Sequence, residues 1–333
     1  MSLPLRNEVV DPATRDRVVH LVAASQGDPL APFALRPEKS YVFSPDGRAA
    51  LGFRIKLHVA VASGDPIGDV ESWPAAIDEF VIRARAQKLR VAVLGASERA
   101  RPLWERHHLG HLSIGRDVVV KRSEFTLRGR SYRNVRQAIQ RTHNSGVKVS
   151  IHVEGELDAG TIAELRAMMK RSQREDTRGF SMILGRLFDG SAPSAVVAIA
   201  RDIDGNVVGA HRYLRAGRSD LSLDLPLRAR GAPNGVDERL VAEVVDWSEQ
   251  FGIERVSLAF APFPDLFANR SNLTILGRLG YYAVHLLDPM IKVEALYRYL
   301  RKFRAFDQER YVMLRWRQVV RVAVAFLLLE FGG

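Results

Sequence analysis

The alternation of apolar and polar residues predicts a series of short elements between residues 41 and 94. Asp46-Gly47 lies between two apolar runs, and this pair favours a type I′ hairpin turn because its residues tolerate positive φ. An apolar strand, a Gly/Pro loop, a helix and a buried strand are expected to follow. The predicted strands are 41–43, 49–54, 57–62 and 90–94, and the loop is SGDPIG at 63–68.

The same order of elements recurs in the second half of the chain. Asp204-Gly205 joins the runs VVAIAR and VVGAHRYL, and then come SLDL, the loop GAPNG, a helix from Val236 and the strand VSLAFA. A repeated order predicts two similar domains. It is the order of N-acetyltransferase-type (GNAT) acyltransferases. The predicted fold is α/β, with two tandem GNAT-like domains at 12–142 (including an Arg-rich linker helix) and 147–290, and basic amphipathic C-terminal helices at 291–333.

Composition narrows the classes of function. The chain has 333 residues, a formal net charge of +11 and no cysteine. The absence of cysteine excludes disulfides, thiolate zinc sites and a cysteine nucleophile, and it is consistent with a reducing cytoplasm. The nine histidines show no metal-ligand spacing, so no metal site is predicted. The positive charge indicates either a polyanionic partner, nucleic acid or an anionic membrane, or a basic protein without such a partner.

Positive charge is concentrated in the tail. Between residues 292 and 321 there are nine Lys or Arg against three acids, with aromatic residues among them. The apolar run at 322–331 is too short to span a bilayer. As a helix it favours an interfacial position on lipid. The alternatives are a helix that packs on the domain core and an RNA contact. Arg298 and Lys302 are the candidate phosphate contacts of this region.

A second basic segment, residues 127–149, lies between the two repeats. A helix is predicted from about Ser131 to Thr142, ended by Asn-Ser-Gly. Its arginines, Arg133 and Arg136 among them, are either a solvated face or a track for the phosphates of tRNA.

Several segments carry a family resemblance. They include SGDPIG (63–68), RGFSMILGR (178–186), SLDLPLRARGAPNGVDE (222–238) and EALYRYLRKF (294–303). In this order they resemble the catalytic region of the lysylphosphatidylglycerol synthases, the multiple peptide resistance factor family, in its actinobacterial stand-alone type. The resemblance covers the chain from about residue 30 to the C-terminus.

The resemblance implies a function. The family transfers an aminoacyl group, lysyl or alanyl, from aminoacyl-tRNA to a hydroxyl of phosphatidylglycerol or a related lipid. The implied partners are aminoacyl-tRNA and an anionic phospholipid membrane surface, with a separate membrane flippase as a candidate, and no further cofactor. The implied location is cytoplasmic, peripheral on the inner face of the cell membrane.

Two positions depart from the family pattern. The usual D-L-M-R reads Asp224-Leu225-Pro226-Leu227, with Arg228 one place late, and Ala259 stands where an Asn is often found. Donor and acceptor therefore stay open. The alternatives are a same-fold acyltransferase with a peptide, cell-wall precursor or small-amine acceptor, and a catalytically degenerate membrane-associated binding module.

The chemistry needs groups that position a hydroxyl, remove its proton and stabilise an oxyanion. Asp224 and Glu238 are the candidate catalytic residues. In the alternative interpretation, Asp224 lies on the solvent face of a strand whose Leu223 and Leu225 face a core. Glu238 would then only be a first-turn carboxylate that the helix dipole favours. The GAPNG loop either offers amides to an anion or is only a turn. The candidate substrate-binding residues are Arg178, Ser181, Arg186, His211, Arg228, Asn234 and Gly235.

Overall fold

The computed structural model describes residues 4–175, 188–262 and 293–331. The chain divides into two compact units. Unit 1 comprises Met1–Asp117, Ala216–Arg218 and Gln308–Gly333, and unit 2 comprises Val118–Arg215 and Ser219–Asp307. Strands β6 (Gly110–Lys121) and β12 (Phe306–Leu314) contribute residues to both units.

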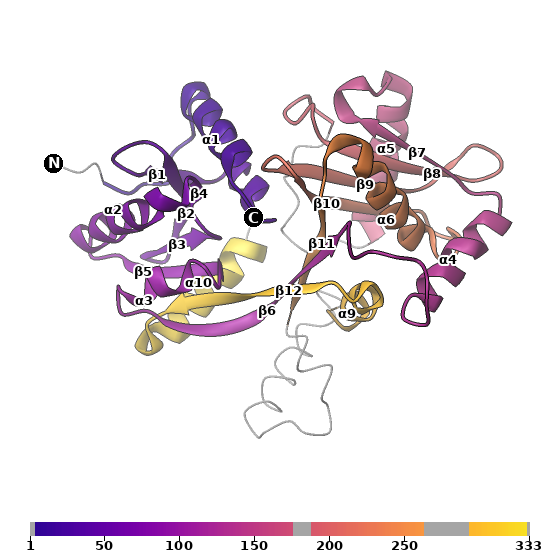
Figure 1. Cartoon of the computed structure of the whole chain (residues 1–333). Helices are drawn as coiled ribbons and strands as arrows, with labels where there is room; N and C mark the ends of the chain where they lie inside the picture. Colours follow the sequence, from indigo (N-terminus) through magenta and orange to yellow (C-terminus); the bar gives the residue numbers. More distant parts are fainter. Residues whose placement is uncertain (1–3, 176–187, 263–292, 332–333) are drawn as a thin grey trace. The chain divides into compact units, whose positions relative to one another are not determined.

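Unit 1 is built on strands in the order β1-β2-β3-β5-β12, with β4 paired to β2. Figure 1 shows its first helices and strands in indigo and violet, with the yellow C-terminal segment beside them. Its further elements are α1 (Pro12–Ala24), β1 (Ser40–Phe43), β2 (Ala49–Lys56), β3 (Val59–Ser63), β4 (Ile67–Gly68), α2 (Trp73–Ala86), β5 (Arg90–Ser97), α3 (Arg101–Glu105) and α10 (Val319–Phe331).

The turns of this unit differ in type from the prediction. Gly47 has φ +72° and its amide donates to Ser44 O, whereas Asp46 has no positive φ. The Asp-Gly pair is therefore not a type I′ turn; only its glycine takes the left-handed conformation, as in loops that begin with a type I turn. The two-residue turn with positive φ at both positions is Leu57-His58, which joins β2 to β3. For this reason β3 begins at Val59 and not at Leu57.

Alternation along β3 fixes which helix covers each face of the sheet. Ala60 and Ala62 pack in a cluster with Phe80 of α2, whereas Val59 and Val61 pack in another with Val322 of α10. Successive side chains of a strand point to opposite faces, and here both faces are covered by apolar helices. Strand β3 pairs with β5 in parallel, and α2 lies between them in the chain.

Unit 2 contains strands in the order β6-β11-β10-β9-β8-β7. Helix α6 packs on one face of this sheet and α5 on the other, since alternate residues of β8 fall in two separate clusters. The elements are α4 (Arg133–Asn144), β7 (Lys148–Val153), α5 (Ala159–Glu175), β8 (Val196–Arg201), β9 (Val207–Ala216), β10 (Asp220–Arg228), α6 (Val236–Trp247), β11 (Arg255–Pro262) and α9 (Val293–Leu300).

The predicted repeat of elements is confirmed. Unit 1 has the hairpin β1–β2, the parallel pair β3 and β5, and helix α2 between that pair. Unit 2 has the hairpin β8–β9, the parallel pair β10 and β11, and helix α6 between them. The Arg-rich helix α4, predicted for the N-terminal domain, lies in unit 2. The mixed α/β fold is that of the prediction.

The tail is helical at its end but not throughout. Between α9 and α10 the chain forms strand β12, which pairs with β5 in an antiparallel manner. The prediction of helices across 291–333 is therefore wrong for 306–314, because alternate buried residues such as Tyr311 and Met313 complete the core of unit 1. Within the described residues, no helix has both the length and the apolar character that crossing a bilayer requires.

Candidate active site

Polar side chains converge at the N-terminus of α6 in unit 2. His211 comes from β9, Arg228 from the end of β10, and Asp237 and Glu238 from the first turn of α6. The short connection from β10 to α6 brings the strand end and the helix start together. Loop-to-helix junctions of this kind concentrate function because a rigid sheet fixes their position.

Asp237 links His211 to Arg228. The Nε2 atom of His211 lies 3.3 Å from Oδ1 of Asp237, and Nη1 of Arg228 donates to Oδ2 at 3.2 Å. The Nδ1 atom of His211 lies 3.1 Å from the hydroxyl of Tyr213. Burial raises the pKa of Asp237, but the hydrogen bonds with His211 and Arg228 and the charge of Arg228 outweigh burial and hold it below the ordinary value. Asp237 is therefore a carboxylate at neutral pH.

Arg228 also fixes the loop before α6. Its Nη2 atom donates to Oδ1 of Asn234 at 3.2 Å and to the carbonyl of Ala232 at 3.2 Å. The structure thus brings together three predicted site residues: Asp237 joins His211 to Arg228, and Arg228 contacts Asn234. The Arg228 side chain keeps 40% of its surface exposed, so it remains open to a ligand.

Glu238 and Lys302 form the second pair of the cluster. Lys302, in the 3₁₀ turn after α9, donates from Nζ to Oε1 of Glu238 at 2.6 Å, and 38% of its side chain is exposed. Tyr299 lies beside them, with Lys302 Nζ 5.7 Å from its ring centroid. Its buried hydroxyl has no hydrogen-bond partner among the described residues. Burial raises its pKa well above the ordinary value, and the charges of Asp237 and Glu238 add to this.

Asp224 lies in a buried ion network. Arg212 donates from Nη1 to Oδ2 of Asp224 and from Nε to Oε2 of Glu154 at 2.5 Å, and all three side chains are buried. The alternative that Asp224 marks a solvent face is therefore wrong. So is the expectation that Leu223 and Leu225 share a face, because they pack in different clusters, with α6 and with α5. The catalytic role of Asp224 stays a prediction.

Gly235 sets the contact between α6 and α4. It has φ +107°, and a Cβ atom there would lie closer to the carbonyl of Ala138 in α4 than van der Waals contact allows. Only glycine meets both requirements. The predicted helix at 131–142 is confirmed as α4, which buries Val135, Ala138 and Thr142 within unit 2.

The predicted phosphate contacts lie on separate parts of unit 2. Arg133 and Arg136 are exposed on α4, and Nη1 of Arg136 also donates to the carbonyl of Gly129 at 3.1 Å. Arg298 is exposed on α9, and Lys302 belongs to the cluster described above. Of the other predicted residues, Arg178, Ser181 and Arg186 lie outside the described residues, as does the side chain of Ala259.

Sequence reasoning missed Asp237, Tyr299, Arg212 and Glu154. An acid in the first helical turn is explained by the helix dipole alone, so Asp237 gave no separate signal. Glu154 and Arg212 are 58 positions apart and meet only in the folded chain. Among the described residues, no group of acidic or histidine side chains could hold a metal ion.

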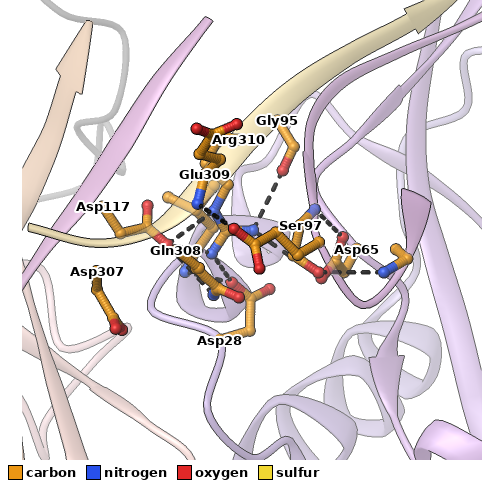
Figure 2. A network of polar contacts seen from close by, with 12 residues as sticks. Asp28, Asp65, Gly95, Ser97, Asp117, Asp307, Gln308, Glu309 and Arg310 are labelled. Atoms are coloured by element: carbon orange, nitrogen blue, oxygen red, sulfur yellow. Dashed lines mark hydrogen bonds and ion pairs between the residues drawn. The ribbon is translucent and has the colours of Figure 1, made fainter. Parts of the chain in front are cut away.

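Unit 1 contains its own buried polar network, centred on Arg310 (Figure 2). This side chain is fully buried and donates to Asp117 at 2.8 Å, Asp28 at 2.6 Å and the carbonyl of Gly95 at 3.2 Å. Asp65 lies 3.9 Å away and accepts the amide of Ser97. The sequence places Arg310 among the basic residues of the tail surface; the structure corrects this, because the residue is a core cation of β12.

One guanidinium faces three carboxylates in this network. Burial, followed by the charge of Asp28, raises the pKa of Asp65 to about 6. Burial also raises the pKa of Asp117. The network therefore binds protons at mildly acidic pH, and because it is closed to solvent we assign it to the stability of unit 1.

These units, each with a hairpin, a parallel strand pair and a helix between that pair, define an α/β protein with a polar cluster at a helix N-terminus in unit 2. The family model for the phosphatidylglycerol lysyltransferase C-terminal region matches residues 19–314, and the chain belongs to this family.

Relatives and a solved structure agree with this assignment. The MprF-like domain protein Rv1619 of Mycobacterium tuberculosis is 45% identical over 96% of this chain and 68% of its own length. The lysylphosphatidylglycerol biosynthesis bifunctional protein LysX of Gordonia bronchialis is 36% identical over 91% of this chain, which spans about 27% of that relative. The structure of L-PGS from Bacillus licheniformis has a TM-score of 0.81 at 20% identity, covering 98% of both chains, and shows the same fold.

Proposed function

We propose that this protein transfers an aminoacyl group, lysyl or alanyl, from aminoacyl-tRNA to a hydroxyl of phosphatidylglycerol. Family membership supports the reaction class, as does the function stated in the name of the LysX relative. In this reaction the acceptor oxygen attacks the ester carbonyl and loses its proton, while the tRNA ribose oxygen leaves and takes one up. The ester is already activated, so the protein needs to supply position, a base and charge stabilisation.

The cluster at the N-terminus of α6 is the observation that carries the proposal. Arg228 and Lys302 are its two partly exposed cations, and each is held by a carboxylate, Asp237 or Glu238. A guanidinium and an ammonium fixed in this way suit a phosphate of the donor or of the lipid. Glu238 lies on the same helical turn, and we assign it the role of base toward the acceptor hydroxyl.

The remaining predicted residues receive supporting roles in the proposal. Asp224 would act through Arg212, whose position it fixes between β9 and β10. Arg133 and Arg136 are exposed on α4, where arginines would follow the phosphates of tRNA. Because the acceptor is a lipid, the protein would act at the inner face of the cell membrane, and a separate flippase would move the product outward.

A different acceptor is the second candidate, and Leu227 favours it. The family's usual arginine at this position is replaced by a leucine that is buried with Leu225 and Leu165 in the core beneath α5. A core position of this kind has no room for a cation without a partner. Arg228 reaches the Asp237 cluster instead, so the site presents its guanidinium from a different direction.

Transfer assays with the purified chain test the proposal. Aminoacyl-tRNAs with labelled lysine or alanine are supplied with phosphatidylglycerol in detergent micelles, and the lipid fraction is analysed by mass spectrometry. We expect a labelled aminoacyl lipid, and a loss of at least about tenfold in kcat/KM for Glu238→Gln. Label found only in a peptide or amine acceptor would replace the lipid assignment with the second candidate. If no product forms with any acceptor, transfer is refuted and the protein is a binding module.

A further inference from the structure

A basic cavity lies in unit 1. It has a volume of about 400 Å³ and is bordered by the end of α2, the start of β5 and the segment before α10. Its polar lining consists of Arg85, Lys88, Arg90, His107, Arg315 and Gln318, and none of the described residues that line it is acidic. Four cations in a small volume indicate an anionic occupant.

These cations are not neutralised by the described part of the protein. Among the described residues, Arg85 donates to the carbonyl of His107, and neither it nor Lys88, Arg90 or Arg315 forms an ion pair. Of the cavity's polar side chains, His107 has an acidic partner, with its Nε2 atom 3.0 Å from Oδ1 of Asp78. The Oε1 atom of Gln318 is buried without a partner there. An amide whose oxygen and nitrogen exchange by rotation can offer a donor to an oxyanion. The cavity is thus equipped for an anion that the described chain does not supply.

An apolar surface continues directly from this cavity. Helix α10 begins one residue after Gln318 and buries Val322 and Ala325 against the sheet of unit 1. Its opposite face, here called the outer face, is also apolar, although it is open to solvent. The outer face consists of Val319, Val320, Val324, Leu327 and Leu328, and Val320 is 75% exposed.

The charged residues of the segment 315–329 are all basic. Trp316 is 57% exposed beside the cavity. Arg315, Arg317 and Arg321 are exposed, and the sequence from 315 to 329 contains no acid. A helix that is apolar on both sides, with a tryptophan and arginines at its start, is typical of segments that rest on a lipid surface.

We propose that the outer face of α10 and the adjoining cavity dock unit 1 onto an anionic phospholipid membrane, with a lipid phosphate in the cavity. Nucleic acid would use the cations but not five exposed aliphatic side chains. A second copy of this chain would bring the same arginines together, and like charges oppose such a contact. A lipid surface satisfies both the apolar face and the cations. The inference adds a docking surface to the proposed function but does not depend on transfer.

Vesicle cosedimentation of the full chain tests this surface. One vesicle population contains phosphatidylglycerol in phosphatidylcholine and the other phosphatidylcholine alone. The face variant Val320→Glu/Leu327→Glu is compared with Val9→Glu/Ile203→Glu, whose side chains are also exposed. The cavity variant Lys88→Gln/Arg315→Gln is compared with Arg6→Gln/Arg218→Gln, which removes the same charge from exposed positions. Circular dichroism establishes that all variants are folded.

We expect the parent and both control variants to bind the anionic vesicles, and the face and cavity variants to bind about tenfold more weakly. Equal binding by a folded face variant overturns the proposal. Binding of tRNA by the cavity variant is also measured. If this variant loses tRNA binding while its vesicle binding is unchanged, the proposal is overturned in favour of nucleic acid. Transfer to phosphatidylglycerol in micelles is measured in parallel: activity without vesicle binding refutes the docking surface alone, and vesicle binding without activity refutes the proposed function alone.

Discussion

Arg212 and Asp224 form an ion pair with essentially no exposed surface, on neighbouring strands of unit 2. Glu154 also pairs with Arg212, so one cation faces two carboxylates. Removing Asp224 would leave Arg212 paired with Glu154, but its buried Nη1 donor would lose its acceptor, and an unsatisfied buried donor is costly. Asp224 therefore has a structural role whatever its part in transfer.

The first prediction follows from this pair. We expect Asp224→Ala to reduce the free energy of unfolding by about 2 kcal/mol, because it leaves a buried donor of Arg212 unsatisfied, as well as reducing transfer. The exposed Asp246 of α6 is the control, and its change to Ala is expected to alter stability by less than about 0.5 kcal/mol. Urea unfolding measures both. If Asp224→Ala is as stable as the control, the ion network contributes little, and a purely catalytic role for Asp224 is favoured.

The second prediction concerns Gly235. We expect Gly235→Ala to lower stability by more than about 2 kcal/mol, because the new Cβ would meet the carbonyl of Ala138 in addition to the strain of positive φ. Gly231 is the matched control: it has φ +81°, but nothing lies within 4 Å of the position that a Cβ would take, so only about 1 kcal/mol is expected from Gly231→Ala. Urea unfolding of both variants gives the difference. Equal effects would mean that α4 shifts to accommodate the new Cβ at little cost in stability.

The third prediction is a pH dependence from the Arg310 network. The pKa of Asp65 is raised to about 6 in the folded state from 3.8, so the folded protein binds more protons than the unfolded chain between these values. Stability then falls as pH rises from about 4 through about 6. In Asp65→Asn, whose Oδ1 still accepts the amide of Ser97, we expect a weaker fall.

Urea unfolding at about pH 4.5 and about pH 7, on either side of the raised pKa, checks this difference. Some dependence on pH is expected to remain in Asp65→Asn, because the pKa of Asp117 is also raised. An unchanged fall in Asp65→Asn would show that Asp65 is not the group that titrates.

The fourth prediction concerns Lys302. We expect Lys302→Met to raise the KM for donor or lipid by about tenfold with a smaller effect on kcat, because the ammonium is assigned to binding a phosphate. Lys170 on α5 is an exposed lysine of the same unit, and Lys170→Met is the control. A fall in kcat at unchanged KM would instead assign Lys302 to the chemical step through Glu238.

The order of elements could be predicted from the sequence because it depends on local signals. Apolar alternation and the turn glycines Gly47 and Gly205 are read within a few residues, and each hairpin and parallel strand pair lies in the expected order. The turn type was not predictable in the same way. Leu57 and His58 adopt positive φ only because the pairing of β2 with β3 requires a two-residue connection, and their own preferences oppose it.

The candidate site was predictable only in part. The end of a strand and the start of a helix are close in sequence, so the sequence alone places Arg228, Asn234 and Glu238 at one junction. It does not identify their partners: Lys302 lies 64 positions from Glu238, and Arg212 lies 58 from Glu154. The sequence does not indicate which charged residues pair when they are so far apart in the chain.

The sequence by itself determined the two-part α/β order, the basic tail and the family of this protein, because the hydrophobic period, the turn residues and the motifs each depend on residues that are close together in the chain. Only the tertiary structure decided which cations are buried and which are open. Arg310 lies in strand β12 and Arg315 directly follows it, yet one is enclosed by aspartates and the other lines an open cavity. Burial depends on which elements pack over a side chain, and that packing is a property of the whole fold.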